Sequence, residues 1–255
     1  MSFEKKVIGT LPPRVTCAEA MLDTIRDLGI VPFFANVIPG YSIEEMTPPE
    51  NWFDTQENLS YTPWDWKIPC VQSGEIAYGK FLLGGKAAFA TVEWYRELRN
   101  WRQSQPKYRP DAAQQQVLDY LAKNGSIGIK EIRGLLGIKK GQADALMTRL
   151  MMQCRVVTGD IIRVFRGPDL HYNGWQTSSF CTPEALFGLS DDAPAGVSDA
   201  PAARKAPAMF FGFPCEDDAP LRPGHSPEES YQCLVSHIRS LFPDVSDKQL
   251  AALLA

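Results

Sequence analysis

Basic and hydrogen-bonding side chains gather on one predicted helix in the middle of the chain. Lys139 and Lys140 stand where this helix begins, and the free backbone amides of a helix N-terminus attract phosphate. Gln142 follows in the first turn, and a glutamine amide can bind an adenine edge through two hydrogen bonds. Thr148 and Arg149 lie further along the predicted outer face. These residue types predict contacts to phosphates, with Gln142 the best candidate for a base contact.

More arginines flank this helix in the sequence. Arg155 and Arg163 border a predicted β-hairpin, where they could contact both sides of a phosphate backbone. Arg99 and Arg102 belong to an earlier predicted helix, and their spacing places them on roughly one helical face. Asp144 is unfavourable in this setting, because a carboxylate repels phosphate unless it accepts a hydrogen bond from cytosine. The predicted nucleic-acid-binding set is therefore Lys139, Lys140, Gln142, Thr148, Arg149, Arg155, Arg163, Arg99 and Arg102.

Charge is strongly segregated along the sequence. Residues 95–166 contain 14 Lys and Arg against 6 Asp and Glu, whereas the rest of the chain contains 12 against 24. A ligand responds to the local field, so the overall net charge of −4 does not exclude a polyanionic partner. The alternative is a solvated helical surface that is basic without a ligand. We expect double-stranded DNA as the partner, and a protein partner stays open.

No arrangement of residues typical of catalysis or metal binding is evident. The three histidines have no metal-ligand spacing to a cysteine or to another histidine. Neither a glycine-rich phosphate loop nor a Gly-x-Ser-x-Gly motif is present. The sequence therefore predicts no catalytic residue, no metal and no cofactor.

The cysteines and the apolar segments indicate the compartment. Six cysteines are scattered without a Cys-x-x-Cys pair, which is typical of free thiols in a reducing environment. No apolar run approaches the roughly 20 residues of a membrane span, and the first residues lack the apolar stretch of a secretory signal. We expect a cytoplasmic protein with no membrane partner.

Apolar periodicity places the basic helix in a winged helix-turn-helix. Helical patterns cover 111–123, 129–136 and 141–153, and β-branched runs at 155–157 and 161–165 predict a hairpin with its turn at 158–160. The expected fold class is α+β, in which three helices and a hairpin wing join an N-terminal α+β segment and a small C-terminal helical tail. The third helix would read the nucleic acid.

The N-terminal segment mixes helices and strands. A capping box of Thr16 and Glu19 predicts a helix that begins at Thr16 and ends at Gly29. An extended run follows at 30–34, then a hairpin around Gly84 and Gly85 and a helix from Val92 to about residue 103. The segment 42–69 is rich in Trp and Pro with little periodicity, which predicts an aromatic cluster packed on the core; a ligand cage is the alternative.

Composition divides the chain into four parts. We expect an N-terminal α+β region at 1–109, a winged helix and closing segment at 110–188, a flexible Ala/Pro/Asp linker at 189–208, and a helical tail at 209–255. Two helices in the tail begin at Ser226 and Ser246. Because helices this short are marginal alone, the tail must dock on the rest of the protein.

Several segments together resemble a group of bacterial AlkZ-related proteins. They include Ile38-Pro-Gly-Tyr-Ser, Pro63-Trp-Asp-Trp-Lys, Ala77-Tyr-Gly-Lys-Phe, Glu93-Trp-Tyr and Thr182-Pro-Glu-Ala-Leu-Phe-Gly. The resemblance spans most of 16–188. AlkZ-type proteins are tandem winged-helix DNA glycosylases that remove damaged bases, so the resemblance implies DNA and a link to repair. Their catalytic signature is Gln-x-Gln or Gln-x-Asp with an apolar middle residue, whereas Gln114-Gln115-Gln116 has a polar one, so no catalytic role is transferred.

Three functions remain open from the sequence. The first is a DNA-binding winged-helix protein, regulatory or repair-associated, that has no catalytic site. The second is an AlkZ-like glycosylase that flips a damaged base into a pocket. The third is an adaptor whose winged helix docks a protein partner.

Overall fold

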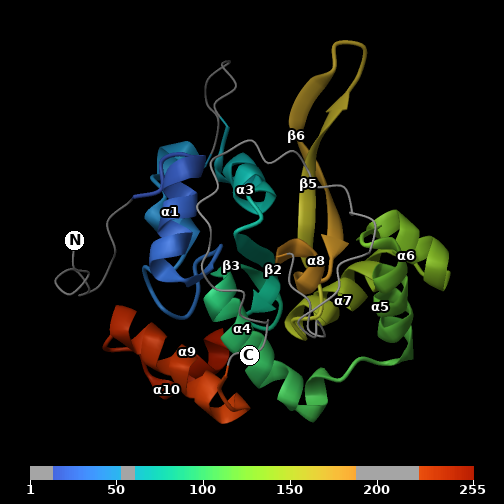
Figure 1. The fold of residues 1–255 in the computed structure, drawn as a ribbon. Coiled ribbons are helices and arrows are strands. Elements are labelled where there is room, and N and C mark those ends of the chain that lie inside the picture. Colours follow the sequence, from blue (N-terminus) through green and yellow to red (C-terminus); the bar gives the residue numbers. More distant parts are fainter. Residues whose placement is uncertain (1–13, 53–60, 188–223) are drawn as a thin grey trace, which may run out of the picture.

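The computed structural model describes residues 14–52, 61–187 and 224–255 (Figure 1). They form an α+β structure with two small antiparallel sheets and two main hydrophobic cores. The predicted linker 189–208 lies outside the described residues. No helix in the described part is long and apolar enough to cross a membrane.

The first core is built on the N-terminal sheet. Its elements are α1 (Ala18–Leu28), β1 (Ile30–Pro32), α2 (Ile43–Met46), the 3-10 helix η2 (Pro49–Asn51), α3 (Pro63–Gln72), β2 (Ile76–Leu82), β3 (Lys86–Thr91) and α4 (Val92–Ser104). The sheet has the order β1-β3-β2, with both pairs antiparallel. The β2–β3 hairpin confirms the predicted turn at Gly84-Gly85, where both glycines have positive φ.

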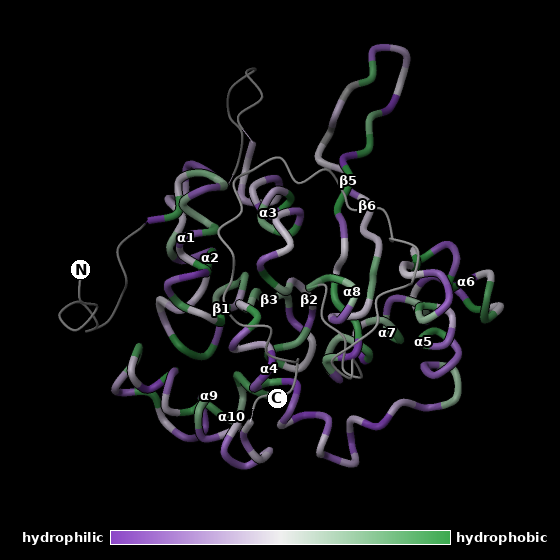
Figure 2. The backbone as a smooth tube through the Cα atoms, in the orientation of Figure 1, coloured by the Kyte–Doolittle hydropathy of each residue, from purple (hydrophilic) through white to green (hydrophobic). Residues whose placement is uncertain are grey.

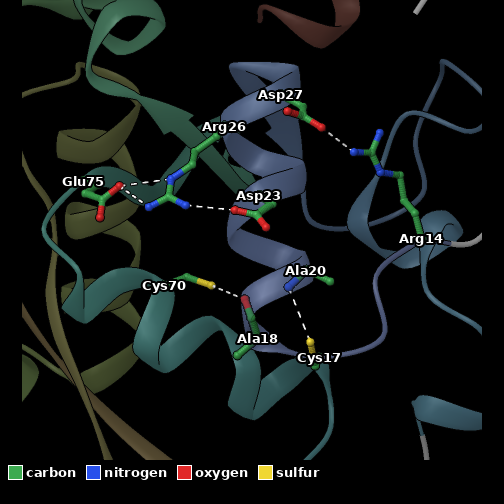
Figure 3. A network of polar contacts seen from close by, with 9 residues as sticks. All are labelled: Arg14, Cys17, Ala18, Ala20, Asp23, Arg26, Asp27, Cys70 and Glu75. Atoms are coloured by element: carbon green, nitrogen blue, oxygen red, sulfur yellow. Dashed lines mark hydrogen bonds and ion pairs between the residues drawn. The ribbon is translucent and has the colours of Figure 1, made fainter. Parts of the chain in front are cut away.

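The N-cap of helix α1 lies one residue later than the sequence predicts. This N-cap is Cys17, whose sulfur accepts from the Ala20 amide, so the capping box at Thr16 was wrong. Arg26 anchors the far end of the helix by donating to Glu75 at 2.6 and 3.1 Å, just before β2 (Figure 3). These contacts fix α1 against the strand that follows α3.

Helix α3 was missed in the sequence because prolines stand at its first position and in its interior, at Pro63 and Pro69. It carries Trp64 into the predicted aromatic cluster. The Trp64 ring lies 5.3 Å from that of Phe33 and 5.8 Å from that of Trp52. These rings pack on one another and on the first core, while Trp64 keeps 42 % of its surface exposed and residues 53–60 of the segment lie outside the described residues.

The C-terminal helices complete the first core. Helix α9 (Pro227–Leu241) begins with the predicted cap Ser226, and α10 (Asp247–Leu253) begins with Ser246. Leu234, Ile238 and other apolar residues of both helices are buried among N-terminal core residues. Figure 1 shows these red helices beside α4. The predicted docking of the tail is therefore confirmed, with α4 as the main contact of α9.

A second core lies between three helices and a second sheet. The elements are η3 (Pro106–Tyr108), α5 (Ala112–Asn124), β4 (Ile127–Gly128), α6 (Ile129–Leu136), α7 (Lys140–Met152), β5 (Val157–Arg166), β6 (His171–Cys181) and α8 (Pro183–Phe187). The sheet has the order β4-β6-β5, and both pairs are antiparallel. The predicted ranges of all three helices agree with α5, α6 and α7 to within about a residue.

The hairpin differs from its prediction. Residues 158–160 are not a turn, because β5 continues through them and pairs with β6 as far as Arg166. Gly159 sits at a register shift, where an added Cβ would lie 2.8 Å from the Cys181 sulfur. The glycine therefore permits close strand contact, and the chain turns instead between Gly167 and Leu170, both with positive φ. The hairpin is much longer than the sequence indicated.

The two cores are joined by direct contacts. Helix α7 packs on β2, and the Lys80 amide contacts the Met151 sulfur at 3.2 Å. Ile68 and Val71 of α3 form a small buried cluster with Ile161 of β5. These contacts set the position of the hairpin and of α7 relative to the N-terminal sheet.

Candidate nucleic-acid interface

Helix α7 is held by apolar contacts on one side, which leaves its first turn exposed. Ala143, Met147 and Leu150 are buried in the second core. Gly137 ends α6 in the left-handed region, which makes the sharp turn into α7. Lys139 stands at the N-cap of α7 and is exposed. The Lys139 ammonium thus stands beside an exposed helix N-terminus, a combination suited to an anion.

The first turn of α7 also contains hydrogen bonds that the sequence did not indicate. Lys140 forms an ion pair with Asp144 at 2.8 Å, which accounts for the unfavourable carboxylate. The Gln142 carbonyl oxygen accepts from the Lys139 amide at 3.0 Å. Because that oxygen caps the helix, Gln142 keeps only its amide NH₂ free of this contact, and a two-bond adenine contact would break the cap.

Thr148 points toward the rest of the protein. Its hydroxyl donates to the Asp144 carbonyl at 2.8 Å, and its methyl carbon lies 2.7 Å from a Cβ placed on Gly85. The residue therefore packs against the β2–β3 turn and is half-buried. Arg149, by contrast, is exposed on the other side of α7.

A groove of about 460 Å³ runs along this other side of α7. It brings together Gln142 and Arg149, two of the predicted site residues, with the start of α5 and the end of α6. Its walls are mostly apolar, with a few polar groups. The lining residues are Asp111, Ala113, Gln114, Gln116, Leu136, Ile138, Gln142, Ala145, Leu146 and Arg149.

Arg99 and Arg102 lie inside the protein rather than on its surface. Arg102 is fully buried, and its guanidinium donates to the main-chain oxygens of Met152, Leu254 and Ala255 at 2.8–3.1 Å. Arg99 is also buried and forms an ion pair with Glu184 of α8. The helical spacing was correct, but the shared face of α4 turns inward, so both residues leave the predicted surface set.

Arg155 and Arg163 are also engaged within the protein. Arg155 is half-buried before β5, where burial, with nearby Arg99, lowers its pKa. Arg163 donates to the buried Asp65 at 3.1 Å, and its guanidinium lies 4.3 Å from the Tyr61 ring centre. Arg163 thus holds the hairpin on α3, and Arg155 is half-buried at the start of the hairpin; neither projects from its outer part.

Asp65 connects the hairpin to α3. Its Oδ1 accepts from Tyr172 at 2.6 Å as well as from Arg163, and Gln176 donates to the Trp64 carbonyl at 2.9 Å. Asp65 is 6 % exposed, so these charge-assisted bonds are shielded from water. The base of the hairpin is therefore fixed on the N-terminal unit, and the outer part beyond Arg163 projects away.

Apolar side chains cover the projecting part of the hairpin, a feature the sequence prediction missed. Phe165 is 53 %, Leu170 70 % and Trp175 58 % exposed. The Arg166 guanidinium lies 5.5 Å from the Trp175 ring centre. Figure 2 shows hydrophobic positions along the strands beyond the body of the protein. Exposed rings on a projecting hairpin indicate a contact surface, because soluble proteins rarely expose such groups together.

Helix α3, which anchors the hairpin through Asp65, also contains a buried lysine. Lys67 of α3 is 9 % exposed beside the Trp64 ring, and burial lowers its pKa to about 8 although Asp65 favours its charged form. The unfolded chain keeps an ordinary pKa near 10.4, so it binds more protons than the folded protein between about pH 8 and pH 10. Stability should therefore rise with pH across this window.

Replacing Lys67 removes the free-energy cost of burying its charged ammonium group. We expect Lys67→Met to be more stable than the unmodified protein at pH 7, by up to about 3 kcal/mol, and to lose the rise between about pH 8 and pH 10. Urea unfolding at several pH values measures both effects. An unchanged pH slope in the variant would contradict this account of Lys67.

The glutamine run at the start of α5 has a structural explanation. Gln114 is buried, its side-chain oxygen accepts from the Asp111 amide at 3.1 Å, and Gln153 donates to the same oxygen at 2.7 Å. Gln115 is exposed and donates to Asp119. Gln116 lines the groove. Gln114 also borders the groove but is buried and hydrogen-bonded, whereas Gln116 is exposed there.

Comparison with known proteins gives one family. A family model described as AlkZ related matches residues 15–206 of the chain. The match covers the N-terminal unit, the three helices and the hairpin, and it confirms the resemblance seen in the sequence. No curated protein and no solved structure matches the chain.

Proposed function

The chain belongs to the AlkZ-related family, which suggests a relationship to DNA repair, and on this premise we propose that it binds double-stranded DNA. In this proposal α7 and the β5–β6 hairpin form the binding surface. The exposed cations are Lys139, Lys140, Arg149 and Arg166. The protein acts as a repair-associated DNA-binding protein.

The order of the elements supports a winged helix-turn-helix. Helix α5 is followed by the short strand β4, then by α6, a tight turn and α7, and then by the β5–β6 hairpin. Strand β4 pairs with β6 at the sheet edge, which closes the sheet against the three helices. In a helix-turn-helix the second helix of the pair enters the major groove, and here that helix is α7.

The observation that carries the proposal is the hairpin, whose exposed rings adjoin a cation. Proteins that bind DNA through its grooves often insert apolar side chains between base steps, which unstacks the bases and bends the duplex. Phe165, Leu170 and Trp175 have this character, and Arg166 beside Trp175 supplies a charge for the phosphates. The Asp65 network holds the base of the hairpin, so the tip is presented by a fixed support.

Removing the exposed rings tests this proposal. We expect Phe165→Ala and Trp175→Ala each to weaken duplex binding by about tenfold, since stacking of one aromatic ring on a base contributes about 1–3 kcal/mol. A duplex with 2-aminopurine should also brighten with the unmodified protein and less with either variant, because unstacking raises its fluorescence.

Val37→Ala serves as the matched control for these variants. Val37 is 42 % exposed in the loop before α2, so the change removes an apolar surface group from another part of the chain. It should bind DNA as the unmodified protein does. Unchanged affinity and fluorescence in both ring variants would contradict the role of the hairpin in DNA binding and favour protein docking.

The groove beside α7 favours a second candidate, a DNA glycosylase. Such an enzyme must accept a flipped base, which it reads by stacking and hydrogen bonds. The apolar walls and the Gln116, Gln142 and Arg149 side chains give the groove this character. Incubation with a panel of alkylated duplexes tests the candidate. Base release that is lost in Gln116→Ala would support it, and intact DNA throughout would contradict it.

A further inference from the structure

Three metal-ligating side chains from distant parts of the sequence converge between α4 and α9. Glu97 lies in α4, His225 precedes the N-cap of α9, and Cys233 lies in the second turn of α9. One ligand atom from each lies within 4.8 Å of the other two. The group lies at α4 and α9, outside the proposed DNA surface on α7 and the hairpin.

The geometry around His225 argues against a catalytic triad. Glu97 Oε1 lies 2.9 Å from Nδ1 of His225, and Cys233 Sγ lies 3.9 Å from the same nitrogen. A triad instead needs the carboxylate and the nucleophile on opposite ring nitrogens, so that one orients the ring while the other gives up its proton. The Glu97 carboxylate and the Cys233 thiol instead approach the same ring nitrogen of His225, as three ligands around a shared cation would.

The spacing of the three atoms fits a tetrahedral zinc ion. With Zn–N and Zn–O bonds of about 2.0–2.1 Å and a Zn–S bond of about 2.3 Å, the nitrogen lies about 3.3 Å from the oxygen and about 3.6 Å from the sulfur. The distances here, 2.9 and 3.9 Å, bracket these values. The third pair, the Glu97 oxygen and the Cys233 sulfur, lies within 4.8 Å, so side-chain rotations that draw these two atoms together would complete the site.

A second observation points to a ligand. The other carboxylate oxygen of Glu97, Oε2, is buried and has no hydrogen-bond partner among the described residues. The Glu97 side chain is only 9 % exposed, and a buried carboxylate without compensation is costly. A cation bound by both carboxylate oxygens of Glu97 would satisfy Oε2 as well as Oε1.

The surroundings hold the ligands in place. The Asn100 amide, one turn after Glu97, donates to the His225 carbonyl at 2.9 Å and to the Ser230 hydroxyl at 2.8 Å. Contacts of this kind hold the ligands of a metal site in place.

We propose that Glu97, His225 and Cys233 bind a zinc ion that joins α9 to α4. His225 is half-exposed, so water can occupy the fourth coordination position. The ion fastens the C-terminal helices to the N-terminal core. A mixture of nitrogen, oxygen and thiolate ligands selects zinc over magnesium or calcium.

Cobalt titration of the full-length, chelator-stripped protein tests the site. Co²⁺ should produce a thiolate-to-metal charge-transfer band and the visible bands of a tetrahedral ion, and Zn²⁺ should then displace it at about one equivalent. Zn²⁺ should also raise the melting temperature, because a ligand that binds only the folded state stabilises it.

Variants separate this site from other thiols. Cys233→Ser should lose the charge-transfer band and the Zn²⁺-induced rise in melting temperature. The control Cys17→Ser, which changes an exposed cysteine away from the site, should keep both. Glu97→Gln and His225→Ala should weaken Zn²⁺ binding by more than about 100-fold, since even an outer-shell partner contributes about 10–100-fold.

Two results would overturn the proposal. One is the absence of the band in the unmodified protein. The other is a band of full intensity in Cys233→Ser, which would assign it to a different cysteine. Far-UV circular dichroism of each metal-free variant establishes that it is folded before titration. Because Cys233 is partly exposed, Cys233→Ser is expected to fold, and it tests the proposal even where Glu97→Gln does not fold.

Discussion

Replacing Arg102 by methionine should destabilise the protein by about 3–5 kcal/mol. The fully buried guanidinium donates to the main-chain oxygens of Met152, Leu254 and Ala255, and thus joins α7 to the C-terminal residues. Methionine fills part of the volume but leaves these oxygens without a donor. Because typical domains unfold with about 5–15 kcal/mol, the loss would be a large share of the total.

Urea unfolding measures this loss, and Arg109→Met is the matched control. Arg109 lies just after η3 and is exposed, so the same change there should cost no more than about 0.5 kcal/mol. Limited proteolysis should also cut the C-terminal helices faster in the Arg102 variant. Equal stability of the two variants would contradict the structural role assigned to Arg102.

Reversing two charges on α7 should have the largest effect on DNA binding. Lys140→Glu with Arg149→Glu replaces two exposed cations by anions on the helix proposed to enter the major groove. Each lost phosphate contact removes about one unit from the salt slope, and added repulsion weakens binding further. At about 0.1 M salt we expect at least about 100-fold weaker binding to a duplex of random sequence.

The double variant Arg239→Glu with Lys248→Glu controls for net charge. Both residues are exposed on α9 and α10, so the change in total charge is the same but lies on the C-terminal helices. This control should retain most of the affinity. Equal losses in the two double variants would mean that α7 has no special part in binding.

The helices of the second core were predictable because their apolar residues repeat with helical spacing. Ile132 in α6 and Ala143, Met147 and Leu150 in α7 face the second core as predicted. Gly137 gave the tight turn between the two helices. Local propensity, spacing and packing agree in this part of the chain, so the pattern alone was sufficient.

The length of the hairpin was predicted incorrectly because a glycine can serve either a turn or a close contact between strands. Thr158-Gly159-Asp160 has the composition of a turn, yet Gly159 makes room for Cys181 on the neighbouring strand. The partner strand β6 is mostly polar and lies beyond the segment that the pattern assigned to the hairpin. Strand pairing is a long-range property, and the local sequence did not specify it.

The arginines show a different limit of sequence reasoning. Helical spacing places Arg99 and Arg102 on one face but does not say what covers that face. The cover comes from Glu184 and from the last residues of the chain, about 85 and 150 positions away in sequence. The Glu97, His225 and Cys233 cluster was missed for the same reason, because Glu97 and His225 are 128 residues apart.

The salt dependence of DNA binding tests the central claim most directly. Fluorescence anisotropy of a labelled random duplex, titrated with the unmodified protein at several salt concentrations, gives the slope of log K against log salt. If about four to six phosphates are neutralised, the slope should be roughly −4 to −5. A flat response, or no binding at low salt, would contradict DNA binding and would favour a protein partner for α7 and the hairpin.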